Sequence, residues 1–316
     1  MRGLFYCFLI GIVFICLKNY LRGVKYEGKS RLDRKTFIIT GANSGIGKET
    51  AKDLTRRGAR VILACRDPVK AKAAVEEIRK SEGFSGEVVS YPLNLASIIS
   101  IRKFVVLFKS AEDRLDVLIN NAGVLCCPCW QTEDGFEMHL GVNHLGHFLL
   151  TNLLLDTLIQ SAPSRVVTVS SYTHHDGKIN FDDINSEKHY NAKDCYDQSK
   201  LANILFTREL SKRLKGSGVT TYCLHPGVSR TNIGRHLWDQ LPVLRPIFYL
   251  YRKLPLFKNC EQGAQTAIYC AVDESVEEET GKYYRECKEA TPAKQALDDG
   301  VAKKLWEISE NMVGLQ

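Results

Sequence analysis

The chain has 316 residues, enough for a large α/β domain with an ample core. Hydrophobic residues make up 44% and charged residues 25%, a globular balance that excludes long disorder, collagen and coiled coil. The formal net charge is +7, but residues 1–35 hold eight Lys/Arg and two acidic residues. Only +1 is left for the remainder, so nothing indicates a nucleic-acid-binding face.

Residues 3–17 form an uncharged apolar run near the N-terminus. As a helix this run spans roughly 22 Å, short of the ~30 Å hydrocarbon core of a bilayer, but the Lys18 and Arg22 side chains are long enough to reach the headgroups. A cleaved signal peptide is the alternative, although no small-x-small cleavage site follows. We therefore predict a membrane anchor over 1–22 and a basic linker over 23–35, which places the following domain in the cytosol.

From Thr36 onward, short aliphatic or β-branched runs alternate with longer helical stretches. The predicted strands are Thr36–Thr40, Arg60–Ala64, Glu87–Tyr91, Leu115–Ile119, Arg165–Val169 and Val219–Leu224. The predicted helices are Ser44–Arg57, Pro68–Lys80, Ser97–Ser110, a long stretch around Gly135–Gln160, Tyr196–Leu214 and Val301–Leu315. Strands that are apolar throughout are typical of a parallel sheet covered on both faces. The sequence therefore predicts an α/β fold, a single Rossmann-type doubly wound parallel sheet with helices on both faces, in one domain over residues 36–316.

A glycine-rich turn follows the first predicted strand and opens the first helix, with the sequence TGANSGIG at 40–47. Glycines allow the tight turn and bring backbone N–H groups close to a pyrophosphate, which the helix N-terminus stabilises. The second strand then ends in Ala64-Cys65-Arg66-Asp67. An NAD enzyme places an acid there for the ribose 2′-hydroxyl, whereas the guanidinium of Arg66 suits a 2′-phosphate, so we predict NADP. The alternative is that Arg66 is a solvated charge and Asp67 only caps the next helix.

Tyr196 and Lys200 lie four residues apart on one predicted helix. A tyrosine has an ordinary pKa near 10, and a neighbouring ammonium lowers that pKa toward the working range of a proton donor and acceptor. The spacing alone is weak evidence, because Tyr284 and Lys288 share it. The context favours Tyr196, since the preceding strand ends in Ser170-Ser171 at the sheet edge where ligands bind.

No metal is expected. The histidines of one long helix (His139, His144 and His147) are interpreted as hydrogen-bonded packing residues, because hydride transfer with a Tyr/Lys pair needs no metal. Eleven cysteines, an odd number without framework spacing, indicate reduced thiols. The cluster Cys126-Cys127-Pro128-Cys129 has no second pair and is interpreted as packing.

The motifs occur in a familiar order. TGANSGIG at 40–47, NNAG at 120–123, Asn143, VVTVSS, YDQSK at 196–200 and HPGV at 225–228 together resemble a short-chain dehydrogenase/reductase. The stretches LACRD, NHLGHFLLT and GSGVTTY are similar to the microsomal, NADP-preferring retinol dehydrogenases. The resemblance covers almost the whole chain.

The resemblance implies a role for each matching position. Tyr196 would be the proton donor and acceptor, and Lys200 would lower its pKa and hold the nicotinamide ribose. Ser171 would bind the substrate oxygen, and Asn143 would complete a water-linked proton relay. The cofactor-binding residues would be Gly41, Asn43, Ser44, Gly45, Ile46, Gly47, Arg66, Asn94, Asn121, Ala122, Gly123, Tyr196, Lys200, Pro226 and Gly227. Asn94 stands where the family has an acid near the adenine, so we expect weaker cofactor binding.

Two segments are expected near the substrate. The stretch of about 229–258 is rich in leucine, aromatic residues and proline, and it predicts a lid over an apolar ligand. The long loop that contains His174, His175 and Tyr190 is expected to border the mouth of the site.

The implied activity is NADP(H)-dependent interconversion of retinol and retinal, all-trans with cis isomers as further candidates, with reduction favoured in cells. The alternatives are reduction of other lipid aldehydes or steroid ketones, and a non-enzymatic NADPH-binding protein. The implied location is the endoplasmic reticulum membrane with the catalytic domain facing the cytosol, and a mitochondrial membrane is the alternative. The partners would be a small apolar substrate and the membrane, and a homo-oligomer stays open.

Overall fold

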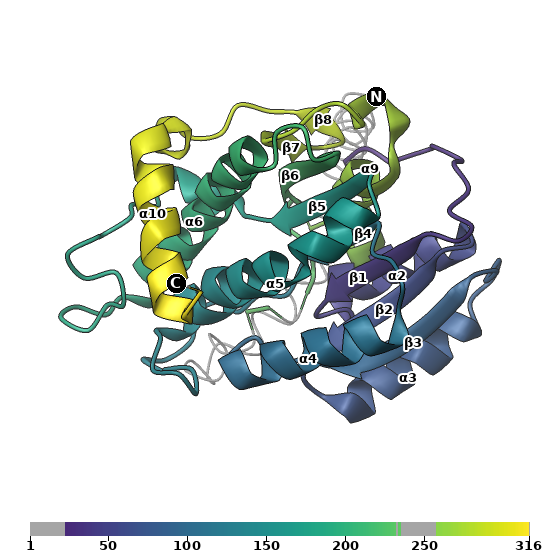
Figure 1. Ribbon diagram of the computed structural model, residues 1–316, viewed down its shortest axis with the longest axis horizontal. Coiled ribbons are helices and arrows are strands. Elements are labelled where there is room, and N and C mark those ends of the chain that lie inside the picture. Colours follow the sequence, from purple (N-terminus) through teal and green to yellow (C-terminus); the bar gives the residue numbers. More distant parts are fainter. Residues whose placement is uncertain (1–22, 232, 235–256, 316) are drawn as a thin grey trace, which may run out of the picture.

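The computed structural model describes residues 23–231, 233–234 and 257–315. Within these residues one sheet has the strand order β3-β2-β1-β4-β5-β6-β7-β8 (Figure 1). The strands are β1 (Thr36–Thr40), β2 (Arg60–Cys65), β3 (Glu87–Pro92), β4 (Val117–Asn120), β5 (Ser164–Val169), β6 (Val219–His225), β7 (Lys282–Arg285) and β8 (Lys288–Glu289). Neighbouring strands pair in parallel except β7 and β8, which are antiparallel. This is the predicted doubly wound parallel sheet.

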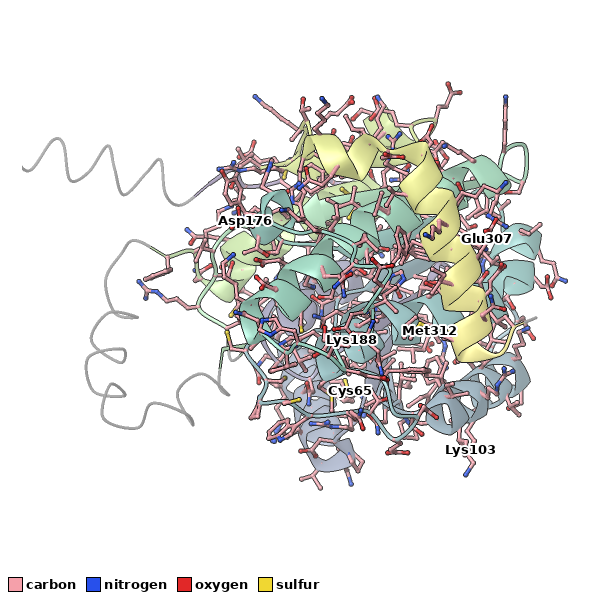
Figure 2. All side chains as sticks on the ribbon, turned by 90° about the vertical axis from the view of Figure 1, so that its left-hand side faces the viewer. Cys65, Lys103, Asp176, Lys188, Glu307 and Met312 are labelled. Atoms are coloured by element: carbon pink, nitrogen blue, oxygen red, sulfur yellow. The ribbon has the colours of Figure 1, made fainter. Side chains whose placement is uncertain are left out.

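Helices cover both faces of the sheet (Figure 1). One face carries α2 (Gly45–Arg56), α3 (Pro68–Arg79) and α9 (Cys260–Val272). The other carries α4 (Ile98–Ala111), α5 (Gly146–Gln160), α6 (Ala192–Arg213) and α10 (Asp299–Val313). The helix α10, with Glu307 and Met312 labelled, lies at the surface in Figure 2, and its Trp306 stacks on Phe206 of α6.

The core follows from the alternation of side chains along buried strands. In β1, Ile39 packs with the α2, α3 and α9 side, whereas Ile38 packs with the α4 and α5 side. Both residues are fully buried, as are Ile62 and Leu63 of the neighbouring β2. A sheet buried on both faces therefore explains why these strands are apolar without interruption.

The strand order reverses next to β1, because the chain moves outward from β1 to β2 and β3 and then returns to β4 on the other side. The loops that follow β1 and β4 consequently diverge at the carboxyl edge and leave a crevice between them. Ligands bind at this point in doubly wound sheets, and the glycine-rich turn and the NNAG turn both lie there.

Several elements differ from the sequence prediction. Helix α6 begins at Ala192, one turn before Tyr196, because Asn191 caps it by accepting hydrogen bonds from the backbone N–H groups of Lys193 and Asp194. The predicted long stretch around Gly135–Gln160 is a π-helix over Leu140–Leu145 that continues into α5. The elements α9, β7 and β8 were not predicted, and β7 has only four residues, of which two are charged.

The predicted linker 23–35 packs onto the body of the protein. Its Tyr26 donates its backbone N–H to Gln265 of α9 (2.9 Å) and makes an edge contact with Tyr269. The predicted anchor over 1–22 and most of the predicted lid over 229–258 lie outside the described residues. In the part of the chain that is described, no helix is both long and apolar enough to span a bilayer.

Candidate active site

A cavity of about 730 Å³ opens at the carboxyl edge of the sheet. Of the predicted site residues, it is lined by Gly41, Asn43, Ser44, Gly45, Ile46, Gly47, Arg66, Asn94, Asn121, Ala122, Gly123, Ser171, Tyr196, Lys200, Pro226 and Gly227. Asn143 does not line the cavity and lies buried behind it. The fold thus brings together residues that are up to 186 positions apart, from Gly41 to Gly227.

The glycine-rich turn is shaped to bring backbone close to a ligand. Gly41 and Gly45 have φ values of +66° and +63°, in the left-handed region that favours glycine. A Cβ on Gly47 would lie 2.5 Å from the Asn121 side chain and 3.1 Å from the Gly41 carbonyl, so no larger residue fits. The turn therefore requires glycine at these three positions.

The N-terminus of α2 is left without a side-chain cap. Ser44 occupies the cap position but makes no capping hydrogen bond, and the first turn has no acidic residue. By contrast, side chains cap α3, α4, α6, α9 and α10. The free N–H groups and the helix dipole at α2 therefore face the cavity as an anion site that fits a pyrophosphate.

The end of β2 places the cation of Arg66 beside this anion site and has Cys65, not an acid, at the last position of the strand, while Asp67 also lines the cavity. Cys65 is buried and contacts the backbone of Ala42 and Asn43, while Arg66 is exposed at the cavity. Asp67 accepts the backbone N–H of Lys70 and caps α3. Arg66 forms no ion pair with another residue in the described ranges, because the neighbouring Asp67 pairs with Lys70. This arrangement fits a 2′-phosphate.

Asn94 has its side chain held on both sides. Its amide nitrogen donates to Glu133 (2.9 Å), and its amide oxygen accepts from the backbone N–H of Ala96 (3.2 Å). The amide oxygen can accept a second hydrogen bond, and Asn94 lines the cavity. Contact with an adenine amino group therefore stays a prediction.

Thr40 and His147 tie the glycine-rich turn to the NNAG turn. The Thr40 hydroxyl oxygen accepts the backbone N–H groups of Asn121 and Ala122, each at 2.9 Å, and hydrogen-bonds to His147 Nε2 at 2.8 Å. His147 Nδ1 lies 3.0 Å from the Asn143 carbonyl oxygen. Burial lowers the pKa of His147 to about 4, so this histidine is a neutral bridge and not a charged group.

Tyr196 and Lys200 lie on the same face of α6 and both reach the cavity. Tyr196 is 7% exposed and Lys200 2% exposed. Lys200 Nζ donates to the Val169 carbonyl (3.2 Å) at the end of β5 and lies 5.6 Å from the centre of the Tyr196 ring. Tyr284 and Lys288, which share the spacing, lie instead on β7 and β8.

Burial dominates the protonation of this pair, which differs from the sequence prediction. Burial raises the pKa of Tyr196 to about 12, opposed by a hydrogen bond with Ser171. Burial also lowers the pKa of Lys200 to about 8. The predicted lowering of the tyrosine pKa is outweighed because the lysine ammonium points to the Val169 carbonyl and not to the phenol oxygen. Tyr196 is therefore protonated at neutral pH.

Ser171 is fixed by the short helix that follows it. Its hydroxyl oxygen accepts the backbone N–H of Thr173 (3.3 Å), and its carbonyl oxygen lies 2.6 Å from His174 Nδ1. His174 Nε2 accepts the backbone N–H of Ala293 (3.1 Å), so the proton is on Nδ1. His174 is fully buried, and neither it nor His175 nor Tyr190 lines the cavity. Thr173 of the same loop does line the cavity, so the expectation that this loop borders the mouth of the site stays a prediction.

The Asn143 side chain holds the backbone of Val124, in the loop that follows β4. Its side chain accepts the Val124 N–H (2.8 Å) and donates to the Val124 carbonyl (3.1 Å) and to Ser199 (2.9 Å). Ser199 in turn donates to the Tyr196 carbonyl. Asn143 lies in the π-helix, a type of helix that is frequent at functional sites. A water-linked relay through Asn143 stays a prediction.

Sequence reasoning did not find the apolar wall of the cavity. The wall residues include Leu93, Leu95, Val124, Leu125, Val142, Val228 and Ile233. Most of them come shortly after the end of a strand, and this position was the sequence signal that could have assigned them to the cavity. Thr173 and His225 also line the cavity and were not assigned to it.

Comparisons with known proteins agree with this geometry. The model of the short chain dehydrogenase family matches residues 35–242. Retinol dehydrogenase 14 of Mus musculus is 53% identical over 291 residues, which cover 89% of this chain and 86% of that relative. Retinol dehydrogenase 13 of Homo sapiens is 51% identical over 308 residues, which cover 96% of this chain and 91% of that relative.

Solved structures share the fold. An uncharacterised protein from Mycobacterium Paratuberculosis aligns with a TM-score of 0.72 and 36% identity, covering 90% of this chain and 95% of the other. L-Sorbose reductase from Gluconobacter frateurii, solved with NADPH and L-sorbose, aligns with a TM-score of 0.63 and 18% identity, covering 81% of this chain and 96% of the other. At that identity the second likeness concerns the fold alone.

Proposed function

Because this chain belongs to the short-chain dehydrogenase family, we propose that it is an NADP(H)-dependent oxidoreductase that interconverts retinol and retinal. One observation carries the proposal: a single cavity joins the uncapped α2 N-terminus and Arg66 at one end to Ser171, Tyr196 and Lys200 at the other. A dinucleotide fits the first end, and a carbonyl or alcohol fits the second. The nicotinamide supplies or accepts the hydride when it is bound.

The protein side of the reaction is proton transfer and positioning. Tyr196 is protonated at neutral pH and is suited to donate its proton to the alkoxide oxygen that forms during reduction. The Ser171 hydroxyl oxygen already accepts from Thr173, which leaves its own proton to stabilise the same oxygen. Lys200 lies near Gly123 in the cavity lining, where it would hold the ribose of the cofactor and return a proton toward Tyr196. Reduction is the direction that we propose for cells, where NADPH is the abundant form of the cofactor.

The substrate class is inferred from the wall of the cavity and from the relatives. Val124, Leu125 and Val142 give the substrate side an apolar surface, and Ser171 and Tyr196 supply polar contacts for one oxygen. A long apolar molecule with a single terminal oxygen matches this distribution. The relatives that are half identical bear the name retinol dehydrogenase, which favours retinal over other lipid aldehydes and ketosteroids.

We further propose that residues 1–22 anchor the enzyme in the endoplasmic reticulum membrane, with the catalytic domain in the cytosol. The uncharged run at 3–17 and the basic residues after it support this placement. The described chain begins at Gly23, packed against the side chains of Lys258 and Glu286, and Lys258 in turn contacts Gly227 of the cavity. An anchor that ends at this point would therefore place the cavity close to the membrane surface, which suits a membrane-dissolved substrate.

The deciding experiment measures NADPH oxidation by membranes that contain this protein, with all-trans-retinal, nonanal or a 3- or 17-ketosteroid. Turnover of retinal at low micromolar concentration supports the proposal. Turnover of nonanal or the steroid without retinal keeps the chemistry and changes the substrate. No turnover with any of them, while NADPH still binds, makes the chain a binding protein and refutes the proposal.

The choice of NADP is tested by Arg66→Ala. Loss of a charged hydrogen bond to the 2′-phosphate is expected to raise KM for NADPH by about 10- to 100-fold, with KM for NADH nearly unchanged. Lys72→Ala on α3 is the matched control, because it removes an exposed cation that does not line the cavity. An equal change of both KM values in Arg66→Ala would show that Arg66 does not read the phosphate.

A further inference from the structure

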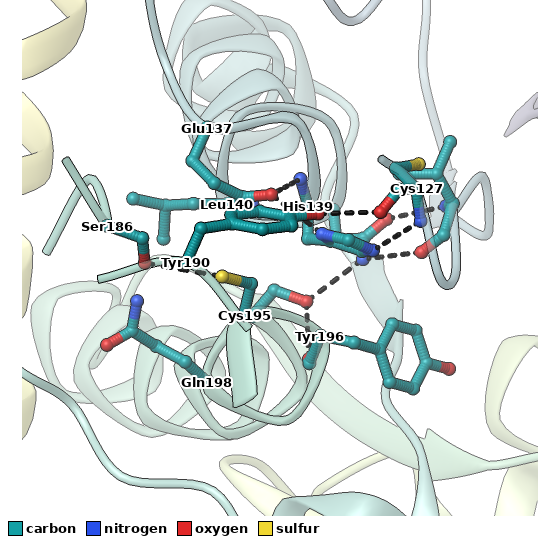
Figure 3. A network of polar contacts seen from close by, with 12 residues as sticks. Cys127, Glu137, His139, Leu140, Ser186, Tyr190, Cys195, Tyr196 and Gln198 are labelled. Atoms are coloured by element: carbon teal, nitrogen blue, oxygen red, sulfur yellow. Dashed lines mark hydrogen bonds and ion pairs between the residues drawn. The ribbon is translucent and has the colours of Figure 1, made fainter. Parts of the chain in front are cut away.

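A buried polar network lies behind the part of the cavity wall that adjoins Tyr196 (Figure 3). Its centre is Glu137, which is 3% exposed. The Glu137 carboxylate accepts the backbone N–H groups of His139 (2.9 Å) and Leu140 (2.8 Å), and it lies 2.7 Å from His139 Nδ1. Glu137 thereby caps the start of the π-helix that carries Asn143 and fixes the His139 ring.

The other ring nitrogen of His139 holds a backbone group. His139 Nε2 accepts the N–H of Cys127 at 3.2 Å. Because a backbone N–H only donates, Nε2 carries no proton, and Nδ1–H is the donor to Glu137. His139 is fully buried, and its ring makes an edge contact with the Tyr196 ring at a centroid distance of 6.1 Å.

The bond to Cys127 fixes an unusual turn. Cys126 has a φ of +51°, a left-handed conformation that is uncommon for residues other than glycine and asparagine. The two residues before it, Val124 and Leu125, line the cavity.

A second loop braces the same turn from the outside. The Tyr190 hydroxyl donates to the Cys127 carbonyl (2.6 Å) and lies 3.0 Å from the Pro128 carbonyl. Asn185 of the same loop accepts the backbone N–H of Glu137 (2.7 Å). Cys127 is therefore held at its N–H by His139 and at its carbonyl by Tyr190, and Figure 3 shows both residues converging on it.

We propose that His139 is a positioning residue for the substrate wall: by accepting the Cys127 N–H it holds the turn at Cys126 and so places Val124 and Leu125 beside Tyr196. This inference rests on the proposed function, because the wall is argued to contact the apolar part of the aldehyde. We expect it to act on substrate binding more than on cofactor binding, since Glu137, His139, Cys127 and Tyr190 neither line the cavity nor bond to the glycine-rich turn or to residues 121–123.

Two variants distinguish the two hydrogen bonds of the His139 imidazole, one with Cys127 and one with Glu137. In His139→Gln the side-chain oxygen reaches the place of Nε2 and keeps an acceptor for Cys127. In His139→Asn the side-chain nitrogen takes the place of Nδ1 and keeps the donor to Glu137, but Cys127 loses its acceptor. We expect His139→Asn to raise KM for retinal about tenfold, while His139→Gln stays within about threefold of the wild type and KM for NADPH is unchanged in both. Any other order of the two variants, or an equal KM in all three proteins, overturns the proposal.

Hydrogen–deuterium exchange of the full chain makes this test independent of turnover. The peptide that contains residues 124–130 should exchange faster in His139→Asn than in the wild type and His139→Gln. Equal exchange in all three would overturn the role of His139. If the wild type reduces no aldehyde yet the exchange order holds, the proposed function fails and the positioning of the turn stands.

Discussion

Tyr196→Phe is expected to lower kcat for aldehyde reduction by about 10²- to 10⁴-fold, the range that a general acid contributes. The phenylalanine keeps the ring in its contact with His139 and removes only the hydroxyl that bonds to Ser171. Because the tyrosine pKa is about 12 in the wild type, the lost group is a proton donor at neutral pH and not a phenolate. NADPH affinity should stay within about twofold, since the glycine-rich turn and Arg66 are untouched. Single-turnover NADPH oxidation with retinal measures the first quantity, and fluorescence titration of NADPH measures the second.

Tyr222→Phe is the matched control for this experiment. Tyr222 is a fully buried tyrosine on β6 whose hydroxyl donates to the Val276 carbonyl, and it does not line the cavity. Its replacement should lower the free energy of unfolding by about 1 kcal/mol and leave kcat unchanged. A wild-type rate in Tyr196→Phe, or an equal loss of kcat in both variants, would remove the proposed proton transfer from Tyr196.

Local sequence patterns predict the buried strands, whereas long-range contacts decide the elements that the sequence prediction missed. The strands β1 and β2 were predicted closely because burial on both faces leaves uninterrupted apolar runs such as Thr36–Thr40. The strand β7 was missed because two of its four residues, KYYR, are charged, and its pairing with β6 is decided by tertiary packing. The same holds for the start of α6, where the cap at Asn191 lies in a stretch without apolar periodicity.

The site shows the same division. Glycine positions, Ser171, Tyr196 and Lys200 could be placed because each follows a strand end or shares a helix face. The partners of buried histidines could not, because they come from far along the chain: His174 bonds with Ala293, and His144 lies 2.9 Å from the Ser309 hydroxyl of α10. The direction of the pKa shifts of Tyr196 and Lys200 could not be predicted either, since it depends on how deeply both side chains are buried in the fold.

Because Lys200 on α6 is buried, Lys200→Met is expected to change both the turnover and the stability of the protein. The variant should lose most of its turnover, since it removes the cation proposed to hold the ribose and return the proton, yet it should be more stable at pH 7. Burial lowers the pKa of Lys200 to about 8, below its ordinary value near 10.5 in the unfolded chain. At pH 7 the native state therefore carries a buried ammonium at a cost of about 3 kcal/mol, which methionine removes at similar volume.

The pH dependence of this gain has a definite sign. Between pH 8 and about 10.5 the unfolded wild type binds more protons at Lys200 than the native state, so the wild-type free energy of unfolding rises with pH relative to Lys200→Met. The advantage of the variant should consequently shrink across this window and vanish above it. The Val169 carbonyl keeps a donor in the variant, because Asn203 bonds to it at 3.1 Å, so no buried acceptor is left unpaired. Urea unfolding of both proteins at pH 7 and pH 10.5 measures the difference. A variant less stable than the wild type at pH 7 would contradict the cost that we assign to the buried Lys200 ammonium.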